Sequence, residues 1–186
     1  MLQKGNELYV WAIKKMLQVT NKVKICYIKS NHDEKMSYAL TLYLNAWFRN
    51  DPRVEVSISP YPRKYFKWGL CMVGLFHKLP KKTKDKIMQE EASDIWGSTI
   101  FREFHGAHEH VERLIEFPGF KIRNISGLTA VGDWACGQGY IGVVRQLQGF
   151  AWDKNSGVID IHNSVVKKEV VINEKDKAVE SESEEL

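Results

Sequence analysis

The chain has 186 residues, a mass of 21.5 kDa and a formal net charge of +4, with 44% hydrophobic and 11% aromatic residues. A chain of this size and composition can bury one substantial core but is too short for two ordinary domains, so we expect one domain over residues 1–163. Residues 164–186 contain no aromatic residue and end in a run of Glu and Ser, which predicts a disordered acidic tail.

The cysteines indicate a reducing environment. Cys26, Cys71 and Cys136 are odd in number and widely spaced, and the first two lie in apolar runs where a thiol packs as a small hydrophobic side chain. No apolar run approaches the roughly 18 to 20 residues that span a bilayer, and the N-terminus lacks the pattern of a secretory signal. We therefore expect a cytoplasmic protein with no membrane partner.

The N-terminal third alternates between helix-like and strand-like segments. Residues 5–20 carry an apolar helical stripe, residues 23–28 form a β-rich run that is apolar on both faces, and residues 34–48 return to helical spacing. Residues 54–58 then alternate like a strand. This order of elements is typical of an α/β fold.

The rest of the chain is dominated by strand-like runs. Residues 65–67 and 70–76 flank Trp68-Gly69, which predicts a tight turn between paired strands. The remaining expected segments, in chain order, are a helix near 83–96, a strand over 100–104 and mostly strand-like residues over 111–163.

A basic region lies between residues 61 and 86. Its cationic side chains are Arg63, Lys64, Lys67, Lys78, Lys81, Lys82, Lys84 and Lys86. Asp85 is the one acidic residue in this range. Such a region suits an anionic partner such as a phosphate ester or nucleic acid, and a solvated helix face or loop is the alternative interpretation.

Polar clusters follow three of the strand-like runs. They are Asn31-His32-Asp33, His77 and His108-Glu109-His110. Because α/β sheets present functional groups at the C-terminal ends of their strands, we expect these clusters to meet at one edge. Imidazoles and an amide oxygen suit borderline divalent ions such as Mn²⁺, Zn²⁺ or Fe²⁺. In an extended His-x-His segment both rings share one face, so we expect both to reach one metal centre.

These motifs resemble those of the calcineurin-like metallophosphoesterases, most clearly the phage and bacterial members. Ser30-Asn31-His32-Asp33 is similar to the family's Gly-Asn-His-Asp/Glu motif, Phe76-His77 to its isolated histidine after a later strand, and Ala107-His108-Glu109-His110 to its Gly-His-x-His. The resemblance spans residues 5–163 approximately. It implies an α/β fold with a metallophosphoesterase-like β-sandwich flanked by helices.

The resemblance also implies a role for each motif residue. Those that would bind the first metal ion are Asn31, His77 and His108, and His110 would bind a second. His32, paired with Asp33, would act as general acid at the leaving group. The implied ions are Mn²⁺ first, with Zn²⁺, Fe²⁺ or Ni²⁺ as alternatives. The implied activity is two-metal hydrolysis of a phosphodiester, with DNA and RNA among the substrates.

The family's Asp-x-His and Gly-Asp-x-x-Asp motifs, which supply the bridging carboxylate, do not precede Asn31. We therefore expect the N-terminal strands of the fold to be missing, and a separate N-terminal polypeptide or a second copy of the chain to complete the site. The alternatives are a catalytically inactive remnant, a module that binds metal or nucleic acid on the same scaffold, a closed structural histidine site, or a permuted site. A permuted site would use Asp160-Ile161-His162 and Gly132-Asp133.

Overall fold

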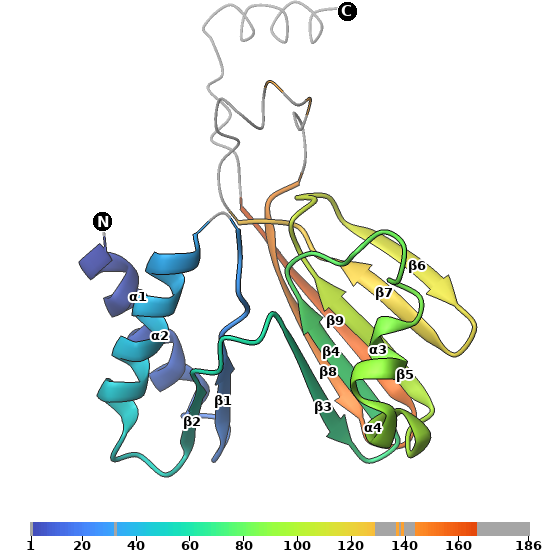
Figure 1. The fold of residues 1–186 in the computed structure, drawn as a ribbon. Coiled ribbons are helices and arrows are strands. Elements are labelled where there is room, and N and C mark those ends of the chain that lie inside the picture. The colour runs from blue at the N-terminus through green and yellow to red at the C-terminus, as the bar shows by residue number, and fades with distance from the viewer. Residues whose placement is uncertain (1, 32, 129–136, 138, 140–143, 167–186) are drawn as a thin grey trace, which may run out of the picture.

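The computed structural model describes residues 2–31, 33–128, 137, 139 and 144–166. Within these residues the chain forms four helices, one five-stranded mixed sheet and two sheets of two strands, and none of these sheets closes into a barrel (Figure 1). The elements are α1 (Leu2–Met16), β1 (Val23–Cys26), α2 (Glu34–Phe48), β2 (Val54–Ser57), β3 (Arg63–Trp68), β4 (Cys71–Phe76), α3 (Ile87–Glu91), α4 (Ser93–Gly97), β5 (Phe101–Gly106), β6 (Arg113–Phe117), β7 (Phe120–Asn124), β8 (Gln146–Asp153) and β9 (Gly157–Val165). The predicted mixed α/β class is therefore confirmed.

The helices α1 and α2 and the parallel pair β1–β2 form the N-terminal part, on the left in Figure 1. Val10 and Ile13 of α1 lie on one helix face, and they are buried against Leu44 and Phe48 of α2 and Val23 of β1. The elements predicted within residues 5–58 are thus present. Asp33 stands at the N-cap of α2, so this helix begins directly after the predicted polar cluster.

The five-stranded sheet has the order β3-β4-β5-β7-β6. The strands β4, β5 and β7 run parallel, while β3 and β6 are antiparallel to their neighbours at the two edges. The turn between β3 and β4 contains Gly69 in the left-handed region, with φ 56°, which confirms the tight turn predicted at Trp68-Gly69. The C-terminal ends of β4 and β5 consequently lie side by side.

One face of this sheet is apolar and packs against the short helices α3 and α4. Its buried cluster consists of Met72, Phe76, Met88, Ala92, Phe104, Phe120 and Ile122. The predicted helix near 83–96 is divided here, because Ala92 leaves the helical region with φ −138° and ψ 50°. The two helices therefore cover the sheet as separate short segments.

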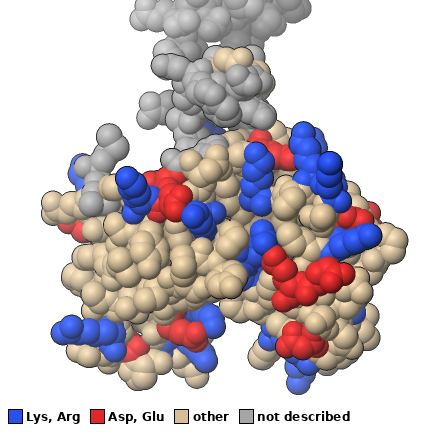
Figure 2. Space-filling view, viewed as in Figure 1, with Lys and Arg blue, Asp and Glu red and all other residues tan. Residues whose placement is uncertain are grey.

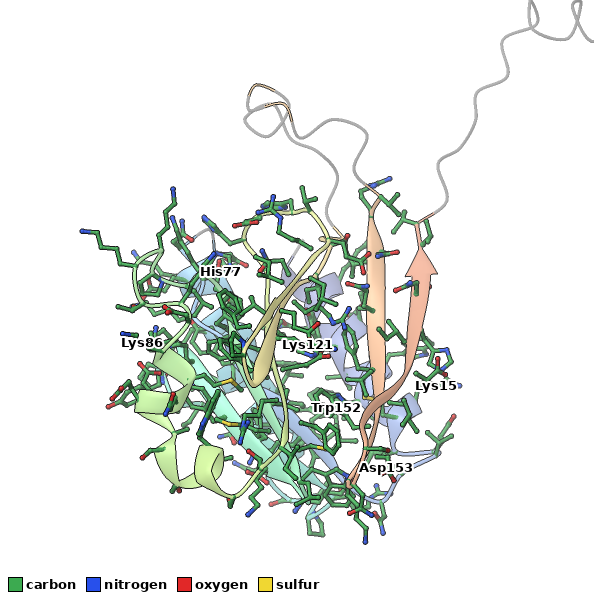
Figure 3. All side chains as sticks on the ribbon, turned by 90° about the vertical axis from the view of Figure 1, so that its right-hand side faces the viewer. Lys15, His77, Lys86, Lys121, Trp152 and Asp153 are labelled. Atoms are coloured by element: carbon green, nitrogen blue, oxygen red, sulfur yellow. The ribbon has the colours of Figure 1, made fainter. Side chains whose placement is uncertain are left out.

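The opposite face of the sheet is polar where the antiparallel pair β8–β9 covers it. Phe150 and Trp152 of β8 contact the ring of His105, with ring centroids 4.5 and 6.0 Å away. The Cys71 thiol donates to the carbonyl oxygen of Asp153 at 3.1 Å. Figure 3 shows the resulting layers, with the β8–β9 pair on one side of the sheet and the short helices on the other.

Glycines on β4 and β5 make room for phenylalanine rings from the neighbouring strand. A Cβ atom on Gly74 would lie 2.0 Å from the ring of Phe104, and one on Gly106 would lie 2.0 Å from the ring of Phe76. The two rings are themselves 4.8 Å apart between centroids. This reciprocal fit fixes the register of the strands that lead to His77 and His108.

No helix in the described part of the chain is both long and apolar enough to cross a membrane. The strand β9 continues to Val165, and most of the predicted acidic tail, residues 167–186, lies outside the described residues.

Candidate metal centre

Three of the predicted ligands meet beyond the C-terminal ends of β1, β4 and β5. The Nε2 atom of His77 lies 2.8 Å from Oδ1 of Asn31 and 3.1 Å from Nδ1 of His108. The two imidazole rings meet edge to face, with centroids 4.9 Å apart. The Ser30 hydroxyl lies 3.5 Å from the same Nε2 atom. Three strand-end segments thus place nitrogen and oxygen donors around one point.

Strand pairing brings the two histidines together. β4 and β5 pair in parallel with Leu75 opposite His105, so the residues just beyond each strand lie at the same edge of the sheet. His77 follows β4 directly, and His108 follows β5 by two residues. Figure 3 places His77 at the end of the sheet away from Trp152 and Asp153.

Asn31 comes from the other sheet, in the loop between β1 and α2. Tyr27 is buried below this loop, and its hydroxyl donates to the carbonyl oxygen of Glu34 at 3.2 Å. The ring of Tyr27 also packs against Tyr38 of α2, with centroids 5.2 Å apart. These contacts hold both ends of the loop, so Asn31 is carried on a short anchored segment.

The backbone of the His-x-His segment differs from the prediction. We expected an extended chain with alternating side chains, but His108 and His110 both have positive φ angles, 76° and 55°. The amide of Glu109 donates to the carbonyl oxygen of Ala107 at 3.0 Å, so the segment is a tight bend. Positive φ costs free energy for residues other than glycine, and such residues concentrate at functional sites.

His110 faces the same pocket as the other histidines, despite the bent backbone. This pocket of about 300 Å³ is lined by Ser30, His77, Ala107, His108, His110, Ile125, Gly127 and Leu128. Among these described lining residues there is no carboxylate. The pocket therefore offers nitrogen and oxygen atoms that can act as ligands, without a described carboxylate.

Of the predicted general acid pair, His32 and Asp33, the structure describes Asp33 alone. His32 lies outside the described residues. Asp33 is exposed at the N-cap of α2, where its carbonyl oxygen accepts a hydrogen bond from the amide of Ser37 at 3.2 Å, while its carboxylate makes no capping hydrogen bond. It is not among the described residues that line the histidine pocket.

The two distances from Nε2 of His77 are close to the spacing of neighbouring ligands around an octahedral divalent ion. Two ligands bound at about 2.1 Å and at right angles to each other are about 3.0 Å apart, which is close to the 2.8 and 3.1 Å observed. Within the described residues, no three His, Cys, Asp or Glu side chains form a metal-binding group. The cluster at this edge instead combines two imidazoles with the amide oxygen of Asn31.

The Nε2 atom of His77 has two close neighbours within hydrogen-bond distance, Oδ1 of Asn31 and Nδ1 of His108. The Nε2 atom of His77 has either one proton or one lone pair in the ring plane. It can therefore donate to Oδ1 of Asn31 or accept from Nδ1 of His108, depending on its tautomer.

One of the two segments considered for a permuted site is described, and it does not line the histidine pocket. His162 and Asp160 pair with each other at 2.8 Å on β9, where both are exposed, and neither lines the histidine pocket. Gly132-Asp133 lies outside the described residues. The permuted arrangement gains no support from β9.

Sequence reasoning missed a buried charged group beneath the β8–β9 pair. Glu103 accepts hydrogen bonds from Arg123 at 3.1 Å and contacts Nε2 of His105 at 2.9 Å, and all three side chains are buried. Burial raises the pKa of the Glu103 carboxyl, but the hydrogen bonds from His105 and Arg123 outweigh it and hold this pKa below its usual range. The carboxylate inside the strand-like run Phe101–Phe104 was the available signal.

Sequence reasoning also missed a second pocket of about 430 Å³ that adjoins the histidines. Ala107 and His108 line both pockets, and Arg113 of β6 joins lysines of the loop after β4 in the second one. The individual lysines could be seen in the sequence, but their meeting with a residue of a later strand could not.

The comparisons with known proteins leave the family open. No protein-family model matches the chain, and no curated protein matches it either. The relation to the calcineurin-like metallophosphoesterases therefore stays a prediction from the motifs.

Proposed function

We propose that this chain is a metal-dependent phosphoester hydrolase on a scaffold like that of the calcineurin-like metallophosphoesterases. The observation that carries the proposal is the meeting of Asn31, His77 and His108. Oδ1 of Asn31 lies 2.8 Å from Nε2 of His77, and Nδ1 of His108 lies 3.1 Å from the same atom. These residues belong to three separate motifs of the sequence, each of which follows a strand.

Each residue has a defined part in the proposal. Asn31, His77 and His108 hold one divalent ion, for which Mn²⁺ is the first choice and Zn²⁺, Fe²⁺ or Ni²⁺ are alternatives. His110, in the same pocket, offers a ligand to a second ion. His32 and Asp33 follow Asn31 directly and supply the general acid pair.

A bound divalent ion would polarise the phosphoryl oxygens and neutralise the negative charge that develops on them. The substrate class that this chemistry serves is a phosphodiester, with DNA and RNA as candidates.

The second metal position needs carboxylates from outside the described lining of the pocket. We propose that a separate polypeptide or a second copy of the chain provides them. In that assembly the present chain contributes Asn31, His77 and His108 to the first ion and His110 to the second.

The absence of a carboxylate among the described lining residues favours one other candidate function. In it the chain binds a single ion, or nucleic acid, through the same residues and hydrolyses nothing. The two candidates agree on the ligands and differ in turnover.

The test measures Mn²⁺ binding by isothermal titration calorimetry and hydrolysis of bis(p-nitrophenyl) phosphate in parallel. The variants are His77→Ala and His108→Ala, and His162→Ala is the matched control because this histidine is exposed on β9. The hydrolase proposal expects Mn²⁺-dependent turnover that both site variants lose and the control keeps. Binding of one ion without turnover would exclude completion of the site by a second copy and would favour a half-site that needs a separate polypeptide, or the binding module. Mn²⁺ affinity that is equal in all variants would overturn both candidates.

A further inference from the structure

The second pocket has a mixed lining that is unlike the histidine pocket beside it. Its cations are Lys78, Lys81, Lys84 and Arg113. Its apolar side chains are Phe76, Leu79, Ile115 and Ile122. A volume of about 430 Å³ lies in the range of small-ligand sites, about 300 to 1,000 Å³. The pocket therefore combines a site for an anion with an apolar floor.

The positive charge of this pocket is only slightly neutralised. Glu109 is the one acidic residue among the described lining residues, and it lies 3.5 Å from Arg113 while it accepts a hydrogen bond from Asn124 at 3.0 Å. Among the described residues, Lys78 and Lys81 have no acidic side chain within ion-pair distance, and the Lys84 ammonium lies 5.8 Å from the Phe117 ring centroid. The lysine charges are thus available to a ligand.

The basic region seen in the sequence therefore divides into two groups with different roles. On β3, Arg63 pairs with Glu91, and Lys67 donates to the hydroxyl of Ser98 at 2.8 Å. In the loop after β4, Lys78 and Lys81 line the pocket instead. Figure 2 shows Lys and Arg side chains gathered over the upper end of the five-stranded sheet, the end at which the histidine pocket lies.

We infer that this second pocket binds the nucleotide next to the scissile phosphate of a single-stranded nucleic acid. The cationic rim holds the phosphate of that nucleotide, and the apolar floor receives its base. A single strand is required because bases in a duplex stay stacked and paired, whereas an unpaired base can turn into a recess. The inference rests on the proposed function, which places the scissile phosphate at His77 and His108.

The shared lining residues link the two pockets directly. His108 and Ala107 border both, so a ligand that fills the second pocket ends beside the proposed metal position. A phosphate ester without a neighbouring nucleotide would occupy only the histidine pocket. The second pocket thus selects a polynucleotide over a simple diester.

The first test is fluorescence anisotropy of a labelled oligothymidylate with the full chain in EDTA, so that neither a metal ion nor hydrolysis is needed. The pocket variant is Lys81→Ala/Lys84→Ala. The control is Lys82→Ala/Lys86→Ala, which removes the same charge from the same segment outside the described lining of the pocket. Thermal unfolding of both variants verifies that they are folded.

We expect the pocket variant to bind the oligonucleotide about tenfold more weakly than the unmodified chain. The slope of log K against the logarithm of the salt concentration should become shallower by about 0.7 for each lost phosphate contact. The control should stay within about twofold of the unmodified chain. Equal weakening in both variants, or none in either, would overturn the inference, as would a duplex of the same length that binds as tightly as the single strand.

The second test locates the bound nucleotide. Stoichiometric Mn²⁺ should broaden the proton resonances of thymidine 5′-monophosphate in the presence of the chain, and the broadening should disappear with Lys81→Ala/Lys84→Ala. Binding in EDTA without broadening in Mn²⁺ would place the nucleotide away from the histidines and overturn the inference. Turnover of the chromogenic diester without oligonucleotide binding would overturn it too, while leaving the hydrolase proposal intact.

Discussion

The Nε2 atom of His77 lies 3.1 Å from Nδ1 of His108, although the two residues are 31 positions apart in the chain. Their contact depends on the parallel pairing of β4 with β5, and that pairing depends on rings that fit against glycines in the core. The geometry of the site is therefore set by residues that do not line its pocket.

Substitution of His108 separates the backbone role of this residue from its proposed role as a metal ligand. Glycine adopts a φ of 76° freely, whereas alanine pays about 1 kcal/mol for it. We expect His108→Gly to be more stable than His108→Ala by about 1 kcal/mol in urea unfolding, with equal loss of Mn²⁺ affinity. At His162, on β9, we expect the glycine variant to be less stable than the alanine variant, because glycine weakens a strand. An alanine variant at His108 as stable as the glycine variant would contradict the left-handed conformation.

A methyl group at Gly74 should disturb the core under the site. Its Cβ would lie 2.0 Å from the ring of Phe104, which has no free space to move because it is fully buried. We expect Gly74→Ala to lower the free energy of unfolding by about 1 to 3 kcal/mol or more. Gly149→Ala is the control, since its Cβ would approach nothing closer than 3.9 Å. Equal stability of the two variants would show that β4 and β5 pack less closely than described.

The Glu103 carboxylate should be essential to the interface between the sheet and the β8–β9 pair. Glu103→Gln removes the charge that compensates buried Arg123, so we expect a loss of about 3 to 5 kcal/mol in chemical denaturation. Glu116→Gln is the control, because its ion pair with Lys121 is exposed at 3.9 Å and should contribute less than about 0.5 kcal/mol. Similar losses in both variants would mean that the buried pair makes no special contribution.

The ion pair between Arg63 and Glu91 should make stability depend on pH. The Arg63 guanidinium, and to a smaller extent the Tyr65 hydroxyl, hold the pKa of the Glu91 carboxyl below its usual range against the opposing effect of burial. A carboxyl with a lowered folded pKa contributes stability above its unfolded pKa of about 4.3 and loses it as the pH falls through the folded value.

The measurement compares Glu91→Gln with the unmodified chain by urea unfolding at several pH values. The difference should be up to about 1 kcal/mol near pH 7 and should decline as the pH falls below about 4. A difference that stays constant down to pH 3 would assign the effect to the shape of the side chain and not to its charge.

The fold could be predicted where local spacing and tertiary contacts agree. The helix over residues 34–48 was predicted with its observed bounds, because its apolar residues recur at helical spacing. The helix near 83–96 was predicted as one segment, whereas the chain breaks at Ala92, an alanine that gives no local signal of a break.

The site could be predicted from motif order but not from residue conformation. Asn31, His77 and His108 each follow a strand, which is visible in the pattern, so their meeting could be expected. The positive φ angles of His108 and His110 could not, because nothing in the local sequence distinguishes a histidine in a tight bend from one in a strand. The contribution of Arg113 to the second pocket depends on the pairing of β6 with β7, which only the folded chain reveals.

Asn31 approaches His77 from a part of the molecule that has its own hydrophobic cluster, separate from the cluster beneath β4 and β5. If the two sheets rotated apart, the amide oxygen would leave while the two imidazoles stayed together, because β4 and β5 remain paired. The number of proposed ligands at this edge would then fall from three to two. Under the proposal of a metal site, affinity for an ion and closure of the N-terminal part against the five-stranded sheet are therefore thermodynamically linked, so that each strengthens the other.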